Sequence, residues 1–234
     1  LDAALKHADE MIRDGAAIID VGGESTRPGY TLISDEEEIA RVTPVIEAVK
    51  KEFDVPVSLD TYKSGVAKAG IEAGADLIND IWGLKWDGTM AAVLAETGVA
   101  SCLMHNRKDT DYKNYLNDVV ADLDETMKMA KEAGIKPILG CEVYVAPNSR
   151  FDKELTGGEE RYHHLVLLAE NNTGYANLMK IVSRGFTEGY YYKPRVDMEV
   201  LQQFHEGIIA LSACLAGEVP RFILKGMKEE ARMA

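Results

Sequence analysis

The feature that most constrains the fold of this chain is a regular alternation of short apolar runs with longer helical patterns. The first four apolar runs lie at residues 16–21, 55–60, 75–79 and 100–104. Helical periodicity separates them, and three further apolar runs follow after residue 136. Strands that are apolar throughout are typical of a sheet covered on both faces, so the alternation predicts a parallel α/β sheet.

The runs amount to seven strands, of which the last three are residues 137–145, 164–169 and 207–212. Parallel strands joined by helices close into an α/β barrel of the TIM type. A length of 234 residues is enough for one such barrel. The long polar stretches 146–161 and 186–200 are expected to be loops. We therefore predict one (βα) barrel of about seven strands.

Polar side chains gather where these strands end. They are Asp20, Asp60, Asn79, His105 and Glu142. The carboxyl ends of barrel strands share one rim, and the binding sites of such folds are built there. The set therefore predicts a site at that rim. The alternative is that the single residues cap loops and helix N-termini.

Composition narrows the range of partners. Hydrophobic residues make up 46% of the chain, enough for a sizeable core, and the formal net charge is −13. That acidity excludes a surface that coats nucleic acid, because such a surface needs basic patches. The cysteines Cys102, Cys141 and Cys214 are widely spaced, and no apolar run reaches membrane length. These features predict a reduced, cytoplasmic protein with no nucleic-acid or membrane partner.

Three motifs in the first half carry a family resemblance. They read DVGGESTRPG at 20–29, SLDT at 58–61 and INDI at 78–81. In this order and spacing they resemble dihydropteroate synthase, and residues 1–133 match about half of that family's length. The resemblance implies a (βα)8 barrel and a transferase of folate biosynthesis. Such an enzyme joins a dihydropterin diphosphate to p-aminobenzoate, and Mg²⁺ assists the release of diphosphate.

The same resemblance assigns roles to single residues. Its pterin-binding positions are two polar residues, Asp60 and Asn79, and two apolar residues that would face the ring, Ile81 and Met104. A pterin presents an edge of N–H donors, so a carboxylate at Asp60 would accept two charge-assisted bonds beside the Asn79 amide. Thr26 and Arg27 match catalytic positions on the loop that closes on the second substrate and the leaving diphosphate. The arginine fork suits phosphate or carboxylate.

Several segments of that family have no counterpart in this chain. They are the metal-binding Asn-Val-Thr-Pro-Asp-Ser-Phe of its first strand, the Asp-Pro-Gly after its sixth strand and its later basic segments. Glu142 stands about where the Asp-Pro-Gly is expected. We therefore expect weak pterin binding without synthase turnover. The missing first strand also predicts an open barrel whose exposed sheet edge favours self-association.

The second half carries different motifs. They read KPILGCEVYV at 136–145, NTGY at 172–175, GFTEGY at 185–190 and ALSAC at 210–214. Residues 131–231 thereby resemble the PHP (polymerase and histidinol phosphatase) domain of the bacterial DNA polymerase III alpha subunit. That resemblance implies metal ligands at Glu142, His164 and Cys214, a set that would bind Zn²⁺ and leave a position open for water. The alternative is that Cys214 is a small core residue.

The two resemblances meet at residues 131–135, which fit both families as the end of a helix before a strand. The sequence therefore predicts a chimera of two half barrels, 1–133 and 134–234, that together form one barrel. Three hypotheses follow for its function. They are a hybrid with a partial pterin site, a metal-binding remnant of the polymerase domain, and a purely structural chimera with no functional site.

Overall fold

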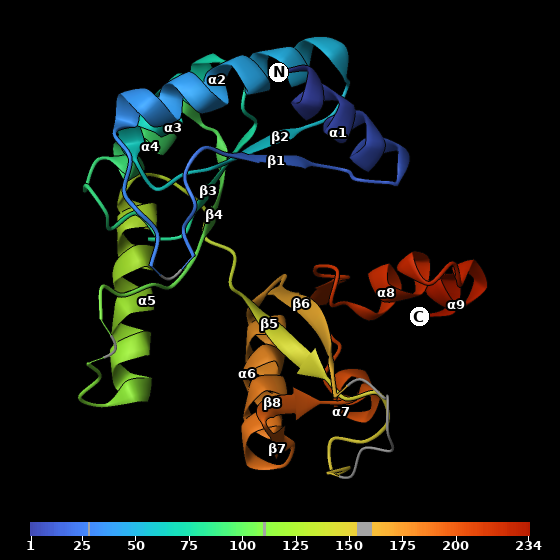
Figure 1. Ribbon diagram of the computed structural model, residues 1–234. Coiled ribbons are helices and arrows are strands. Elements are labelled where there is room, and N and C mark those ends of the chain that lie inside the picture. Colours follow the sequence, from blue (N-terminus) through green and yellow to red (C-terminus); the bar gives the residue numbers. More distant parts are fainter. Residues whose placement is uncertain (28, 110, 154–160) are drawn as a thin grey trace. The chain divides into compact units, whose positions relative to one another are not determined.

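The chain folds into two compact units, Leu1–Pro137 and Ile138–Ala234. The structure is a computed structural model that describes residues 1–27, 29–109, 111–153 and 161–234 (Figure 1). The division falls close to the expected boundary at residue 133. No helix in these described ranges is both long enough and apolar enough to cross a membrane.

The first unit follows the expected alternation of helices and strands. Its elements are α1 (Asp2–Arg13), β1 (Ile19–Gly22), α2 (Asp35–Glu52), β2 (Val57–Asp60), α3 (Ser64–Glu72), β3 (Leu77–Asp80), α4 (Met90–Thr97), β4 (Ala100–Leu103) and α5 (Tyr115–Glu132). The four strands form one sheet in the order β1-β2-β3-β4, and every neighbouring pair is parallel. The prediction of a parallel α/β sheet is confirmed for this unit.

The elements of the first unit form for local reasons that the sequence carries. Helix α2 begins where the Ser34 hydroxyl accepts a hydrogen bond from the Glu37 N–H at 3.2 Å. Acidic residues fill its first turn and lysines its last, as the helix dipole favours. Helix α4 ends at Gly98, whose φ of 68° is the left-handed conformation that glycine adopts without strain.

The core of the first unit lies between its sheet and its helices. Leu59 and Ile78 of the central strands are fully buried against Ile46 of α2 and Leu94 of α4. On the edge strands β1 and β4, exposed and less exposed residues alternate along the chain. The side chains that point away from the helices therefore remain accessible, and the polar strand-end residues are among them.

The second unit is built around a mixed sheet. Its elements are β5 (Gly140–Val145), β6 (His163–Ala169), α6 (Asn172–Thr187), β7 (Tyr190–Tyr191), β8 (Lys193–Val196), α7 (Met198–Gln203), β9 (Ile208–Leu211), α8 (Glu218–Leu224) and α9 (Lys228–Met233). The strand order is β7-β8-β5-β6-β9. Among its described strands, only the β5–β8 pair is parallel, whereas β5–β6, β6–β9 and β7–β8 are antiparallel.

The predicted count of seven strands, all of them parallel, is therefore wrong. The described residues hold nine strands in two separate sheets. Parallel neighbours need a crossover connection that usually contains a helix, and the described residues between β5 and β6 contain none. These two strands pair antiparallel instead, which ends the barrel-type repeat after the first unit.

One further prediction fails within the second unit. The stretch 186–200, expected to be a loop, contains β7, β8 and the start of α7. Its polar sequence is compatible with strands because the Arg195 side chain is buried and donates hydrogen bonds to the carbonyl oxygens of Arg150 and Asp152. Near the end of the chain, α8 and α9 are separate helices because the chain turns at Gly226 with a φ of 75°.

Candidate functional site

The two polar pterin-type positions come together at one end of the first sheet. Strands β2 and β3 are parallel neighbours, and their register places Asp60 beside Asn79. On its other side Asp60 is in register with Gly22 of β1. Residues in register on parallel strands point to the same face of a sheet. The structure thus brings the expected carboxylate and the expected amide side by side.

Asp60 is the most perturbed carboxyl group of this site. Burial first, and then the negative charges of Asp20, Glu38 and Asp80, raise its pKa from 3.8 to about 6. Its Oδ1 atom is buried and has no hydrogen-bond partner among the described residues. A buried acceptor without a donor is costly. This oxygen is therefore the atom of the site that would gain most from a ligand N–H.

Asp80 fixes the backbone near the two apolar positions of the site, Ile81 and Met104, and was not among the predicted site residues. The Asp80 carboxylate accepts hydrogen bonds from the N–H groups of Trp82 at 2.8 Å and Leu84 at 2.7 Å. These bonds fix the turn after β3 that carries the half-buried Ile81. The Asp80 carbonyl accepts from the N–H of Met104, whose side chain is 48% exposed. An aspartate at the start of a turn is the signal that could have predicted this role.

Thr26 and Arg27 lie on the loop between β1 and α2. Thr26 is half-buried and Arg27 is exposed. The Arg27 carbonyl accepts a hydrogen bond from the Tyr30 N–H at 3.0 Å, while its guanidinium makes no ion pair with any described residue. Pro28 lies outside the described residues. Within the described ranges, the guanidinium of Arg27 is therefore a cation without an acidic partner, in the same unit as Asp60.

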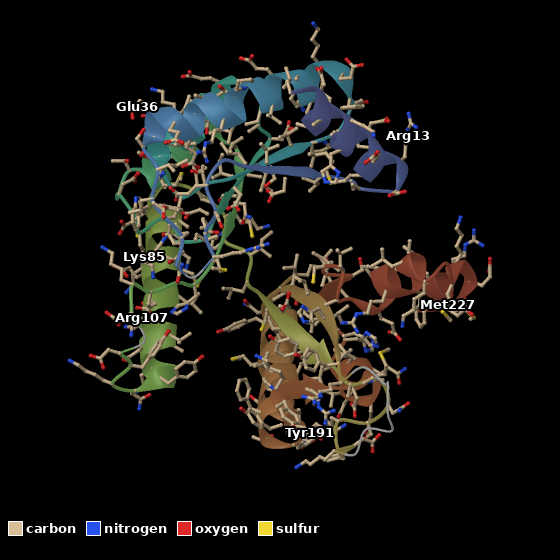
Figure 2. The ribbon with its side chains drawn as sticks, viewed as in Figure 1. Arg13, Glu36, Lys85, Arg107, Tyr191 and Met227 are labelled. Atoms are coloured by element: carbon tan, nitrogen blue, oxygen red, sulfur yellow. The ribbon has the colours of Figure 1, made fainter. Side chains whose placement is uncertain are left out.

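His105 is held by a partner on α5. Its Nε2 lies 2.9 Å from Oδ2 of Asp122, and the same oxygen accepts from Nε of Arg107 at 2.7 Å. Figure 2 labels Arg107 beside α5. Charge-assisted hydrogen bonds of this kind fix side-chain direction. The interaction of His105 is thus directed to the helix, and this favours the alternative that it caps local structure.

The expectation of five polar groups on one rim is wrong for Glu142. Asp20, Asp60 and Asn79 lie on the sheet of the first unit. Glu142 lies within β5 of the second unit, in register with Val166 of the antiparallel strand β6. Its strand belongs to a different sheet, so strand order along the chain does not place it on the same rim.

The three expected metal ligands do approach one another within the second unit. Nδ1 of His164 lies 3.3 Å from Oε1 of Glu142 and 3.5 Å from Sγ of Cys214. Nevertheless, no group of three or more His, Cys, Asp or Glu side chains in the described part of the chain is arranged to hold a metal ion. Cys214 is exposed, so the alternative that it is a core residue is wrong. The metal site itself stays a prediction.

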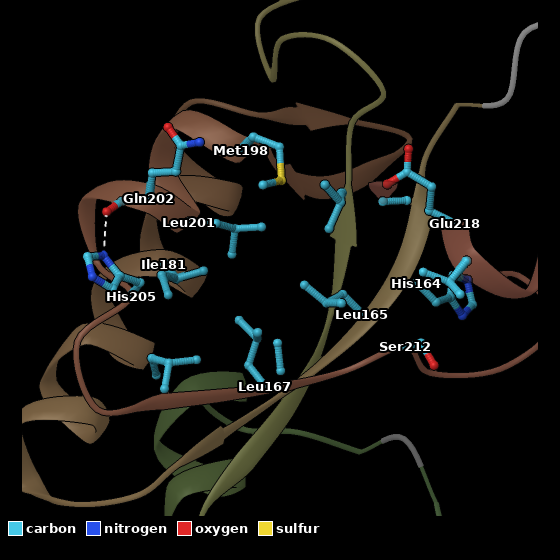
Figure 3. Close-up of a pocket in the computed structure, with 15 residues that line it drawn as sticks. His164, Leu165, Leu167, Ile181, Met198, Leu201, Gln202, His205, Ser212 and Glu218 are labelled. Carbon is cyan, nitrogen blue, oxygen red and sulfur yellow. Dashed lines mark hydrogen bonds between the residues drawn. The ribbon is translucent and has the colours of Figure 1, made fainter. Parts of the chain in front are cut away.

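The second unit also contains an apolar cavity of about 500 Å³ (Figure 3). Its apolar lining includes Leu165 and Leu167 of β6, Ile181 of α6 and Leu201 of α7. His205 stands at its margin, with Nδ1 2.7 Å from the Gln202 carbonyl. None of the pterin-type positions contributes to this lining.

The first unit is thus an α/β fold with a parallel sheet and with a carboxylate and an amide on adjacent strand ends. Comparison with known proteins agrees with this class, because residues 1–165 match the family model of pterin binding enzymes. The chain belongs to this pterin binding enzyme family. The match continues past residue 133, where the second resemblance was expected to take over.

Individual proteins with similar sequences agree with this family. The chain is 60% identical over 179 residues to a dihydropteroate synthase of Clostridium beijerinckii, which covers 76% of this chain and 65% of that protein. It is 56% identical over 135 residues to a dihydropteroate synthase of Bacillus subtilis, which covers 58% of this chain and 47% of that protein. The chain therefore spans less than two thirds of the length of these relatives.

Solved structures give the same picture. A dihydropteroate synthase from Clostridium difficile, solved in the presence of pteroic acid, aligns with a TM-score of 0.55 and 42% identity, over 58% of this chain and 52% of that one. A dihydropteroate synthase from Xanthomonas albilineans, solved with 4-aminobenzoic acid, aligns with a TM-score of 0.54 and 38% identity, over 58% and 50% of the two chains. These comparisons support the pterin-related resemblance and lend no support to the polymerase-related one.

Proposed function

We propose that this chain binds a pterin of the dihydropteroate synthase type, with Asp60 and Asn79 as its polar contacts. The observation that carries the proposal is the buried Oδ1 of Asp60, which lies beside Asn79 and has no hydrogen-bond partner in the described part of the chain. An ionised carboxylate there accepts N–H groups of the pterin edge as charge-assisted bonds. The amide of Asn79 both donates and accepts, and Ile81 and Met104 would contact the ring.

The loop between β1 and α2 completes the proposed site. Arg27 is exposed and without an ion pair among the described residues. A guanidinium in that state suits a diphosphate or a carboxylate, because its planar fork pairs with two oxygens at once. Thr26 lies beside it on the same loop. The proposed ligands are therefore a dihydropterin diphosphate and, more weakly, p-aminobenzoate.

The proposal includes binding without synthase turnover. The chain spans less than two thirds of the length of the relatives it matches, so their complete activity is not assigned to it. The side chains in the described ranges offer no group suited to hold Mg²⁺, so no step is assigned to that ion.

The test is calorimetric titration with dihydropterin diphosphate. Asp60→Asn should weaken binding roughly tenfold or more, because it removes hydrogen bonds to a charged group. Asp54→Asn is the matched control, since Asp54 is exposed and lies on the same unit. Equal losses in both variants would contradict the assignment of Asp60. Release of diphosphate on addition of p-aminobenzoate would contradict the absence of turnover and leave binding intact.

A second candidate function is zinc binding by Glu142, His164 and Cys214. The mutual approach of the three side chains supports it. Their side chains would have to rearrange before all three could ligate one ion, since the described residues contain no group arranged to do so. Elemental analysis should find one zinc per chain, lost in Cys214→Ser and kept in the control Cys102→Ser. A metal-free wild type would contradict this candidate.

The chimeric origin belongs with these proposals. The separate sheet of Ile138–Ala234 is compatible with an origin distinct from that of the first unit. A purely structural product remains the alternative to both binding functions. It predicts that neither dihydropterin diphosphate nor Zn²⁺ raises the melting temperature, because a ligand that binds the folded state stabilises it.

A further inference from the structure

A buried ion network stands behind the loop that carries Thr26 and Arg27. The Lys63 side chain is 5% exposed, and its Nζ lies 3.0 Å from Oε2 of Glu24 and 2.8 Å from Oε2 of Glu38. The two glutamate side chains are 3% and 2% exposed. Tyr62 adds a hydrogen bond from its hydroxyl to Glu24. We call Glu24, Glu38, Tyr62 and Lys63 the Lys63 network.

This network closes the loop at both of its ends. Glu24 precedes the loop residues, and its Oε2 accepts a hydrogen bond from the Ile33 N–H at 2.7 Å. The carbonyl of the same Ile33 accepts from Nζ of Lys63 at 2.8 Å. Thr26 and Arg27 lie between these two anchored residues. The Lys63 side chain therefore contacts both ends of the loop, Glu24 at its start and Ile33 at its end.

The position of Lys63 along the chain links the loop to Asp60, the carboxylate that is proposed to bind the pterin. Lys63 is the residue before α3 and lies three places after Asp60, which ends β2. The two are joined by Thr61 and Tyr62, both buried. A short, buried connection leaves little freedom between them. The distance from the loop anchor to the proposed pterin carboxylate is thereby fixed by the backbone itself.

The charges of the network suit an anchor. Burial raises the pKa of Glu24, but hydrogen bonds from Ile33, Tyr62 and Lys63 outweigh this and hold it below its usual range. Burial likewise lowers the pKa of Lys63, and its contacts with Glu38 and Glu24 raise it above the usual value. Buried ion pairs contribute little net stability compared with apolar residues of similar size. Geometric specificity is the better explanation for keeping such a group here.

We infer that Lys63 is a positioning residue, which holds the loop from Glu24 to Ile33 so that Arg27 meets the anionic group of a ligand bound at Asp60. The inference rests on the proposed pterin binding. It assigns Lys63 no contact with the ligand. Its consequence is selective: Lys63 sets the affinity for the anionic part of the ligand and leaves the affinity for the pterin ring alone.

The first test measures the loop directly by amide hydrogen exchange of the whole chain. In Lys63→Met, the Ile33 amide and its loop neighbours should exchange about tenfold faster, as expected for losing a hydrogen bond to a charged group. Lys63→Arg should restore protection. Lys50→Met is the matched control, because Lys50 pairs with Asp76 in the same unit and lies outside the Lys63 network. Unchanged exchange in a folded Lys63→Met overturns the inference.

If Lys63→Met does not fold, Glu24→Gln takes its place in both tests. It preserves side-chain shape and the Lys63–Glu38 pair, and it removes the charge that holds the Ile33 N–H. The same faster exchange is expected in the loop. Protection equal to that of the wild type overturns the inference as before.

The second test separates positioning from general stability by comparing two ligands. Dihydropterin diphosphate should bind Lys63→Met about tenfold more weakly than the wild type, as expected for a weakened hydrogen bond to a charged group. The hydroxymethyl dihydropterin that lacks diphosphate should bind both proteins equally, and Lys63→Arg should recover the difference. An equal loss for both ligands overturns the inference and leaves the proposed function standing. A wild type that binds neither ligand overturns the proposed function, and the positioning role with it.

Discussion

At the scale of single residues, Asp60 is expected to couple two opposite pH dependences. Its pKa of about 6 in the folded chain lies above the value of 3.8 for a free carboxyl. The folded state therefore holds this proton more tightly than the unfolded state. The corresponding stabilisation is complete below the unfolded pKa and is lost as the pH rises through 6.

This linkage predicts the stability of Asp60→Asn. The variant carries no charge at this position, so it should be more stable than the wild type at about pH 8, by on the order of 1–2 kcal/mol after allowance for partial exposure. The difference should shrink as the pH falls through 6. Urea unfolding of both proteins across this range measures it. A variant less stable than the wild type at high pH would contradict burial as the main cause of the raised pKa.

Pterin binding should depend on pH in the other direction. A carboxylate accepts two N–H groups only when ionised, so affinity should decline below about pH 6 and level off above it. Titration with dihydropterin diphosphate at several pH values measures this. The same side chain would then cost stability where it confers binding, as is common for functional groups.

At the scale of elements, the sequence allows prediction of what depends on local pattern. The strands ending at Asp60 and Asn79 are apolar runs, and parallel neighbours bring their ends together without further information. The Ser34 cap of α2 follows from residue type and spacing in the same way. The sequence alone therefore predicts that Asp60 and Asn79 lie side by side at one end of the sheet, as they do.

Other elements depend on contacts between residues that are distant in the sequence, and the local pattern of apolar and polar residues does not predict such contacts. The polar sequence around Arg195 predicts a loop, but Arg195 lies in β8 and is buried. Its burial is possible because the carbonyl oxygens of Arg150 and Asp152, distant in the sequence, accept its N–H groups. A lysine in this sequence context is expected at the surface. Lys63 is buried because Glu24 and Glu38, which are distant in the sequence, lie close to it in the fold and pair with it. The apolar pattern also does not predict that β5 and β6 are antiparallel. The relative direction of two strands depends on the connection between them, which the pattern of apolar residues does not describe.

At the scale of the whole molecule, the four-stranded sheet leaves two edges. In the described residues β1 pairs only with β2 and β4 pairs only with β3. Unpaired N–H and C=O groups along an edge strand are templates for another strand. The net charge of −13 opposes such contact between copies. Screening this repulsion with salt should therefore promote self-association.

We predict that the purified chain self-associates reversibly through these edges, more strongly at high ionic strength. Sedimentation velocity over a wide concentration range measures the mass distribution. Ala100→Lys places a charge on the exposed side of β4 and should shift the distribution towards monomer, since edge lysines discourage strand pairing. Ala95→Lys, an identical change at an exposed position of α4, is the control for added charge. If both variants respond alike, or the wild type stays monomeric in high salt, the edges do not mediate association.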